Sequence, residues 1–147
     1  MKKIIPIAAS SLFLAFAVLL IGQKGSDKSL VSQWEEVEEA TKKGLPKTAI
    51  EKLDPLIERA LKEKAHAVAI RAIGQKINLE GAIQGNKPEE KITRMEAEMA
   101  KAPKEIVPMM NAVLANWYWQ YFQRNRWRFT QRTQTAEAPG GDITTWD

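Results

Sequence analysis

The sequence predicts an all-α protein of stacked, repeat-like helical hairpins that follow an N-terminal signal or anchor helix. Three observations lead to this prediction. Apolar residues recur at spacings of three and four, glycine and proline mark the ends of successive segments, and one pattern of these residues occurs twice. The chain has 147 residues, of which 44% are hydrophobic. This is enough for one modest core, so we expect one compact domain with flanking segments.

The N-terminus has the pattern of an export signal. Lys2 and Lys3 precede a charge-free apolar run over residues 4–22, and a basic segment followed by an apolar one is typical of signal peptides. The length of the run is also close to the roughly 20 residues that a membrane-spanning helix needs. Residues 1–23 are therefore expected to be a cleaved signal peptide or an uncleaved signal anchor. The body of the chain is expected in the periplasm or cell envelope, touching a membrane only through residues 4–22.

The body begins with a predicted helical hairpin over residues 29–65. The stripe of a helix is the set of residues that its spacing places on one face. In the first helix the stripe is Leu30, Trp34, Val37 and Thr41. Gly44 lies just past its last turn and is the expected stop. The second helix has Pro46 in its first turn, and its stripe is Ile50, Leu53, Ile57 and Leu61. Pro55 lies inside this helix, where it should remove one backbone hydrogen bond and bend the helix.

A second hairpin is expected over residues 66–102. The stripe of its first helix is Ile70, Ile73 and Ile77, and Gly81 is the expected stop. The next helix has Asn86 as its expected cap and Pro88 in its first turn. Its expected inward residues are Ile92, Met95 and Met99.

One three-residue pattern occurs once in each hairpin. Its copies are Gly44, Pro46 and Ile50, and Gly85, Pro88 and Ile92. The offset of about 41 residues lies in the range of helical repeats. Weak repeat symmetry is therefore expected, in the form of stacked hairpins.

The fifth predicted helix starts near Pro103 and is rich in aromatic residues. Residues 116–129 hold three of the five Trp, both Tyr and two of the four Phe, interleaved with Arg. The residues expected to face inward recur at spacings of three and four, and form the inward seam of this helix: Val107, Met110, Leu114, Trp117 and Tyr121. Because Tyr118, Trp119 and Phe122 point to other faces, this helix should be buried on more than one side. The compact helical domain is thus expected over residues 28–129.

We expect the aromatic cluster to serve packing or an interface within the protein rather than to bind a ligand. The residues with this expected role are Trp34, Trp117, Trp119, Tyr121, Phe122, Arg126 and Trp127. The alternatives are a ligand-stacking platform and a groove for single-stranded nucleic acid. Setting aside Lys2 and Lys3 leaves 20 basic residues against 18 acidic ones. That near-neutral balance, together with export, argues against a nucleic-acid partner.

The composition excludes most catalytic and metal-binding chemistry. The chain has no Cys and a single His66, which excludes disulfides, thiolate ligands, a Cys nucleophile and a His-based metal site. Glu35 with Glu39, or Glu96 with Glu105, would be candidate acid pairs, but nothing in the sequence places them in a cleft. We therefore expect no enzyme activity, no catalytic residue, no cofactor and no metal ion.

Three stretches, in order, resemble the N-terminal region of large bacterial alpha-2-macroglobulin family proteins. They read "GLPKTAIEKL", "YWQYFQRNRWRFTQRT" and "DITTWD". The resemblance runs from about Trp34 to Asp147, and each stretch is a packing signature. It implies an exported protein that traps proteases or protects the envelope, with macroglobulin β-sandwich domains after a helical region. In many members a Cys-Gly-Glu-Gln thioester captures the protease.

This chain departs from that plan because it has no Cys and no β-sandwich segment before Asp147. The resemblance therefore implies the structural helical region of an exported endopeptidase inhibitor or envelope-defence protein, without trapping chemistry of its own. Residues 130–147 have the composition of a linker, which would lead to macroglobulin domains absent from this chain. Those domains are the implied partners, and proteases would be met only through the full-length protein. The alternative is a membrane-tethered helical-repeat adaptor that binds a protein partner in the cell envelope.

Overall fold

A computed structural model describes residues 28–85, 87–131 and 143–145. These residues form α-helices and one short 3₁₀-helix, and they contain no strand, which confirms the all-α prediction. The elements are α1 (Leu30–Lys42), α2 (Pro46–Lys62), α3 (His66–Ile83), α4 (Pro88–Lys101), α5 (Val107–Gln131) and the 3₁₀-helix η1 (Ile143–Thr145). The expected signal or anchor segment, residues 1–23, lies outside the described residues, as does most of the expected linker.

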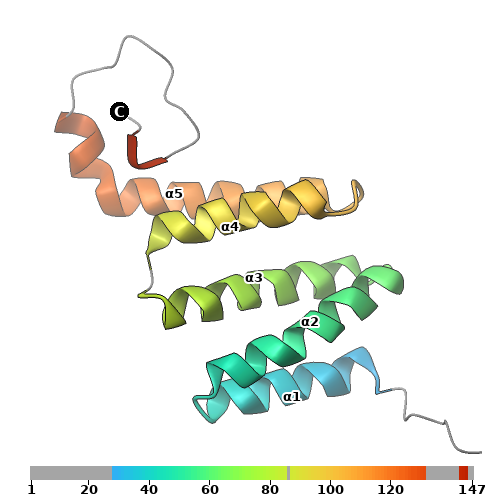
Figure 1. Cartoon of the computed structure of the whole chain (residues 1–147). Helices are drawn as coiled ribbons and strands as arrows, with labels where there is room; N and C mark the ends of the chain where they lie inside the picture. The colour runs from blue at the N-terminus through green and yellow to red at the C-terminus, as the bar shows by residue number, and fades with distance from the viewer. Residues whose placement is uncertain (1–27, 86, 132–142, 146–147) are drawn as a thin grey trace, which may run out of the picture.

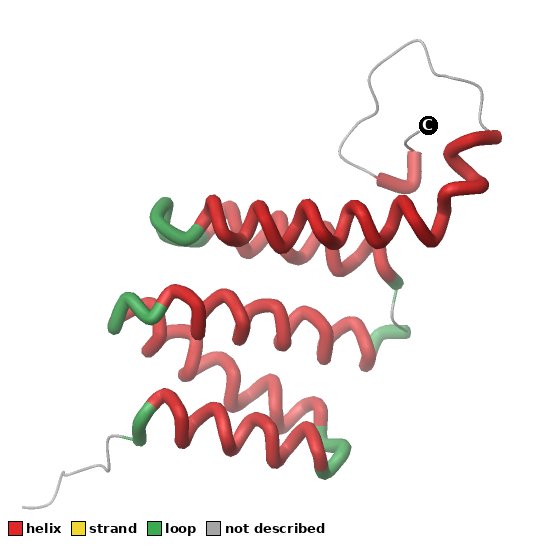
Figure 2. Tube along the Cα trace, turned by 180° about the vertical axis from the view of Figure 1, so that it is seen from behind, coloured by secondary structure: helices red, strands yellow, loops and turns green. Residues whose placement is uncertain are grey.

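The helices stack in chain order (Figure 1), and each packs against the helix before and after it. The view from behind shows the same order (Figure 2). This arrangement agrees with the prediction of stacked hairpins. No helix within residues 28–85, 87–131 and 143–145 has the length and apolar character needed to cross a membrane.

The first two connections of the stack use the same turn. After α1, the amide of Leu45 donates to the carbonyl of Ala40 at 3.0 Å, and the amide of Gly44 donates to Thr41 at 3.0 Å. After α2, the amide of Ala65 donates to the carbonyl of Ala60 at 2.8 Å, and that of Lys64 to Leu61 at 3.1 Å. The left-handed position is Gly44 in one turn, with φ 69°, and Lys64 in the other, with φ 56°. Both are Schellman turns, which close a helix by satisfying its last carbonyl groups.

Two predicted helix boundaries were wrong. Gly81 does not end α3, because it is buried inside the helix, and α3 continues to Ile83. The glycine with a positive φ after α3 is Gly85, whose φ is 95°, and this left-handed conformation is typical of the residue that follows a helix. The N-cap of α4 is Lys87 rather than Asn86, because Pro88 holds the residue before it in an extended conformation.

The buried face of α2 also differs from the predicted stripe. Its buried residues are Ala49, Leu53, Leu56 and Ala60, so only Leu53 was placed correctly. Ile57 and Leu61 are partly buried at its margins. Because α2 packs between α1 and α3, alanines on its inner face allow both neighbours to approach closely. The helix runs through Pro55 without interruption, and the Pro55 side chain is exposed.

The core consists of two clusters, which meet at α3. The first lies between α1, α2 and α3 and contains Val37, Ala40, Ala49, Leu53, Leu56 and Ala72. The second lies between α3, α4 and α5 and contains Ile73, Ile77, Ile92, Met95, Ile106, Met110, Leu114, Tyr121 and Ile143. The predicted inward residues Ile92 and Met95 are buried, whereas Met99 is partly buried. The second cluster therefore positions the aromatic half of α5.

Candidate functional site

The aromatic residues of α5 differ widely in burial. Tyr121 is 4% exposed and belongs to the core, and Trp117 packs against that core with part of its ring. Trp119 is 58% exposed and Trp127 is 65% exposed. The expected packing or interface role of Trp119 therefore stays a prediction, and within the described residues its ring is largely exposed. A helix that is apolar nearly all round has more apolar surface than α4 and η1 cover.

Trp119 and neighbouring rings of α5 line an open apolar groove on one side of the helix, here called the aromatic groove. Its volume is about 600 Å³, and its lining residues are Ala115, Tyr118, Trp119, Tyr121, Phe122, Phe129 and Ile143. None of these residues is charged. The groove can bury apolar side chains of another molecule, but it offers no group for acid–base or nucleophilic catalysis.

Ring contacts fix the shape of the aromatic groove. Phe122 lies between two neighbours on the same helix: its ring stacks with Trp119 at a centroid distance of 5.7 Å and contacts Phe129 at 5.5 Å. Phe129 in turn meets the edge of Tyr121 at 6.2 Å. Pairs of this kind stabilise each other beyond the area that they bury. The buried Tyr121 thus anchors Phe129, and through it Phe122 and Trp119, by successive ring contacts.

The 3₁₀-helix η1 forms one wall of the aromatic groove. Ile143 is 5% exposed and belongs to the core cluster. The guanidinium of Arg128 donates to the carbonyl oxygen of Thr144 and so ties η1 to α5. Residues 130–147 were expected to be a linker, and within this stretch Ile143 packs into the core. A single apolar residue among polar ones carries no periodicity that would reveal it.

Tyr118 connects the aromatic groove to α4. Its hydroxyl donates to a carboxylate oxygen of Glu96 at 2.5 Å. Burial, supported by this hydrogen bond, raises the pKa of Tyr118 to about 12. The phenol therefore stays neutral and keeps its donor at physiological pH.

The remaining predicted packing residues lie outside the aromatic groove. Trp34 packs within α1–α3: its indole donates to Glu38 at 2.8 Å, and the Arg71 guanidinium lies 4.1 Å from its ring centroid. Arg126 and Trp127 are exposed on α5. An interface role for these last two stays a prediction.

The described residues contain no group of three or more His, Cys, Asp or Glu side chains that would hold a metal ion. Glu39 forms an ion pair with Lys43, and Glu96 accepts the hydrogen bond from Tyr118. The two acid pairs suggested by the sequence thus have other contacts for at least one member each. Comparisons with protein-family models, curated proteins and solved structures found no match. The alpha-2-macroglobulin resemblance stays a prediction from sequence motifs.

Proposed function

We propose that this chain is a structural helical region of an exported alpha-2-macroglobulin-like endopeptidase inhibitor or envelope-defence protein. It supplies no trapping chemistry. In this proposal the aromatic groove of α5 binds a macroglobulin domain, which is a β-sandwich, and fixes that domain relative to the helical stack.

The observation that carries the proposal is the exposure of Trp119 in the aromatic groove. Trp is the residue type most enriched at the energetic centre of protein interfaces, and here it lies beside Phe122 in an uncharged groove of about 600 Å³. Contiguous apolar surface of this kind marks interaction sites in soluble proteins. The two sequence stretches "YWQYFQRNRWRFTQRT" and "DITTWD" both contribute lining residues to the groove, through α5 and Ile143.

The direct test is binding in trans to a recombinant macroglobulin domain from a bacterial member of the family. The full chain, kept in mild detergent, is titrated with that domain by calorimetry. We expect saturable binding that Trp119→Ala weakens by at least tenfold, because truncation of a central aromatic residue commonly costs about 2 kcal/mol of binding free energy.

Met109→Ala is the matched control. Met109 is an exposed apolar residue of the same helix that does not line the aromatic groove, so this variant should bind within twofold of the unchanged chain. Absence of binding by the unchanged chain would contradict the proposal, and equal losses in the two variants would show that the groove is not the contact surface.

The second candidate is a membrane-tethered helical-repeat adaptor that binds another envelope protein. The repeated Schellman turn at Gly44 and Lys64 favours it, because helical-repeat proteins stack similar units into extended binding surfaces. Site-specific photo-crosslinking from position 119 in cells separates the two candidates. A crosslink to a macroglobulin domain supports the first, and one to an unrelated envelope protein supports the second.

A further inference from the structure

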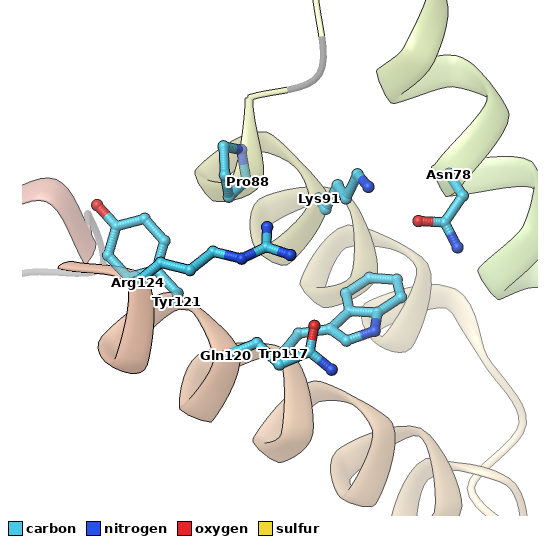
Figure 3. A pocket seen from close by; sticks show the side chains of 7 residues that line it. All are labelled: Asn78, Pro88, Lys91, Trp117, Gln120, Tyr121 and Arg124. Atoms are coloured by element: carbon cyan, nitrogen blue, oxygen red, sulfur yellow. The ribbon is translucent and has the colours of Figure 1, made fainter. Parts of the chain in front are cut away.

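A second cleft lies on the side of α5 that Trp117 faces (Figure 3). Three helices form it, because its lining residues come from α3, α4 and α5. They are Asn78, Pro88, Lys91, Trp117, Gln120, Tyr121 and Arg124. Apart from Tyr121, it shares no lining residue with the aromatic groove. We call it the basic cleft.

Two cationic side chains reach into the basic cleft from different helices. Figure 3 shows the Arg124 guanidinium extending from α5 toward the space beside Lys91 of α4. The lining contains no acidic residue. Within the described part of the chain, neither cation forms an ion pair or a hydrogen bond with another side chain. Two like charges that share one cleft repel each other, and a bound anion removes that repulsion.

Two cations at neighbouring helix interfaces have acidic partners. Lys76 of α3 pairs with Asp54 of α2 at 2.6 Å, and Arg94 of α4 pairs with Glu80 of α3 at 2.8 Å. Lys91 lies three residues before Arg94 on the same helix, yet its cleft offers no carboxylate. The missing counter-charge is therefore a property of the basic cleft rather than of the whole interface between α3 and α4.

The other lining residues suit an oxyanion. The indole of Trp117 forms an apolar wall of the cleft. The Asn78 side chain lies at the α3 edge of the cleft (Figure 3) and can donate a hydrogen bond. The volume is about 180 Å³, roughly that of six waters. This volume fits a phosphate or carboxylate with a few attached atoms.

We propose that the basic cleft binds an oxyanion, a phosphate or a carboxylate, between Lys91 and Arg124, with the Trp117 ring as its wall. The site would recognise the negative charge of the anion and donate hydrogen bonds to it from two sides. Guanidinium and ammonium groups form strong, charge-assisted hydrogen bonds with both phosphate and carboxylate. It is independent of the aromatic groove, so failure of the proposed macroglobulin contact leaves it standing.

The test is an NMR titration of the full chain in mild detergent with inorganic phosphate, with acetate and with chloride at constant ionic strength. Phosphate or acetate should cause saturable shifts at the Trp117 indole and the Asn78 side-chain amide. Lys91→Gln and Arg124→Gln should each weaken this binding about tenfold, because each removes one charge-assisted contact. Lys91→Arg, which keeps the charge, should retain it.

Arg126→Gln is the matched control, since Arg126 is an exposed arginine of the same helix outside the cleft. It should leave the affinity within twofold. Stronger binding of phosphate identifies a phosphate-bearing ligand, and stronger binding of acetate identifies a carboxylate such as that of an acidic polypeptide. Shifts that chloride reproduces, or an Arg126→Gln loss equal to that of Arg124→Gln, overturn the proposal. Far-ultraviolet circular dichroism of each variant checks that the helices remain folded.

Discussion

The two ends of the helical stack are closed in different ways. Between α1, α2 and α3 the buried residues are largely alanines, with a few larger side chains such as Leu53 and Leu56. Between α4 and α5 they are large: isoleucine, methionine and Tyr121. The first three helices also pack more extensively on each other than α4 packs on α3 or α5.

This difference accounts for the aromatic groove at the α5 end of the stack. Alanines let helix backbones approach closely, whereas the bulky rings of α5 line a groove. Ion pairs also cross the first interfaces, for example Lys52 of α2 with Glu36 of α1 at 2.7 Å. Among the described residues, no arginine of α5 pairs with a carboxylate. The first three helices are thus joined by ion pairs across their interfaces, and in our proposal another molecule completes α5.

The largest expected contrast comes from truncating one buried and one exposed side chain. Leu53→Ala in the first cluster should lower the free energy of unfolding by about 2–5 kcal/mol, because Leu53 is fully buried and leaves a cavity. Trp119→Ala should change it by only about 0.5 kcal/mol, as is usual for exposed positions. Urea unfolding followed by circular dichroism measures both. Similar losses in the two variants would show that the aromatic groove is core after all.

Enlarging a buried alanine tests the close packing of the first three helices. Ala60→Leu should destabilise the chain by about 1–3 kcal/mol, because Ala60 is fully buried on α2 and the added atoms have no space. Ala112→Leu is the control, since Ala112 is exposed on α5, and it should be nearly neutral. A stable Ala60→Leu chain would mean that α1–α3 is packed more loosely than the alanines suggest.

The helices were predictable from the sequence, but the faces that they bury were less so. The recurrence of large apolar residues located every helix and placed Leu53, Ile92 and Met110 correctly. It missed the alanine face of α2, because a pattern weighted toward large residues follows Ile57 and Leu61 instead. The buried face of α2 includes small residues because the helix packs between two others, and no single segment shows which helices it packs between.

The candidate sites were only partly predictable. The concentration of Trp and Tyr on α5 identified the right helix. The spacing of three and four placed Tyr121 on the inward seam, which its burial confirms, but the sequence did not show how far Trp119 is exposed. Contacts distant in sequence were not foreseeable: Ile143 reaches α5 from the expected linker, and Lys91 and Arg124 come from different helices to one cleft.

A smaller effect should follow from changing the residue at the left-handed position of each Schellman turn. Lys64 has the positive φ that Gly44 has in the equivalent position, and a side chain there costs about 1 kcal/mol relative to glycine. Lys64→Gly should therefore stabilise the chain by about 1 kcal/mol, and Gly44→Ala should destabilise it by a similar amount. Thermal unfolding of the two variants measures this, and a destabilised Lys64→Gly chain would show that Lys64 makes contacts that outweigh its strain.

The smallest expected effect is a loss of stability in acid that originates in α1. Hydrogen bonds from Lys28 and then from Lys52 lower the pKa of Glu36 to about 2, from an ordinary value of 4.5. Because the folded chain holds this carboxylate ionised more strongly than the unfolded chain does, its contribution is present above pH 4.5 and disappears as the pH falls toward 2. Glu36→Gln should therefore reduce stability at pH 7 and flatten the fall in the urea midpoint between about pH 5 and about pH 2, the window of that pKa shift. The exposed Glu105, in the loop before α5, provides the control: Glu105→Gln should keep the acid profile of the unchanged chain. If Glu36→Gln keeps that profile too, the bridge between α1 and α2 does not stabilise the first three helices, and the contrast with α5 must rest on packing alone.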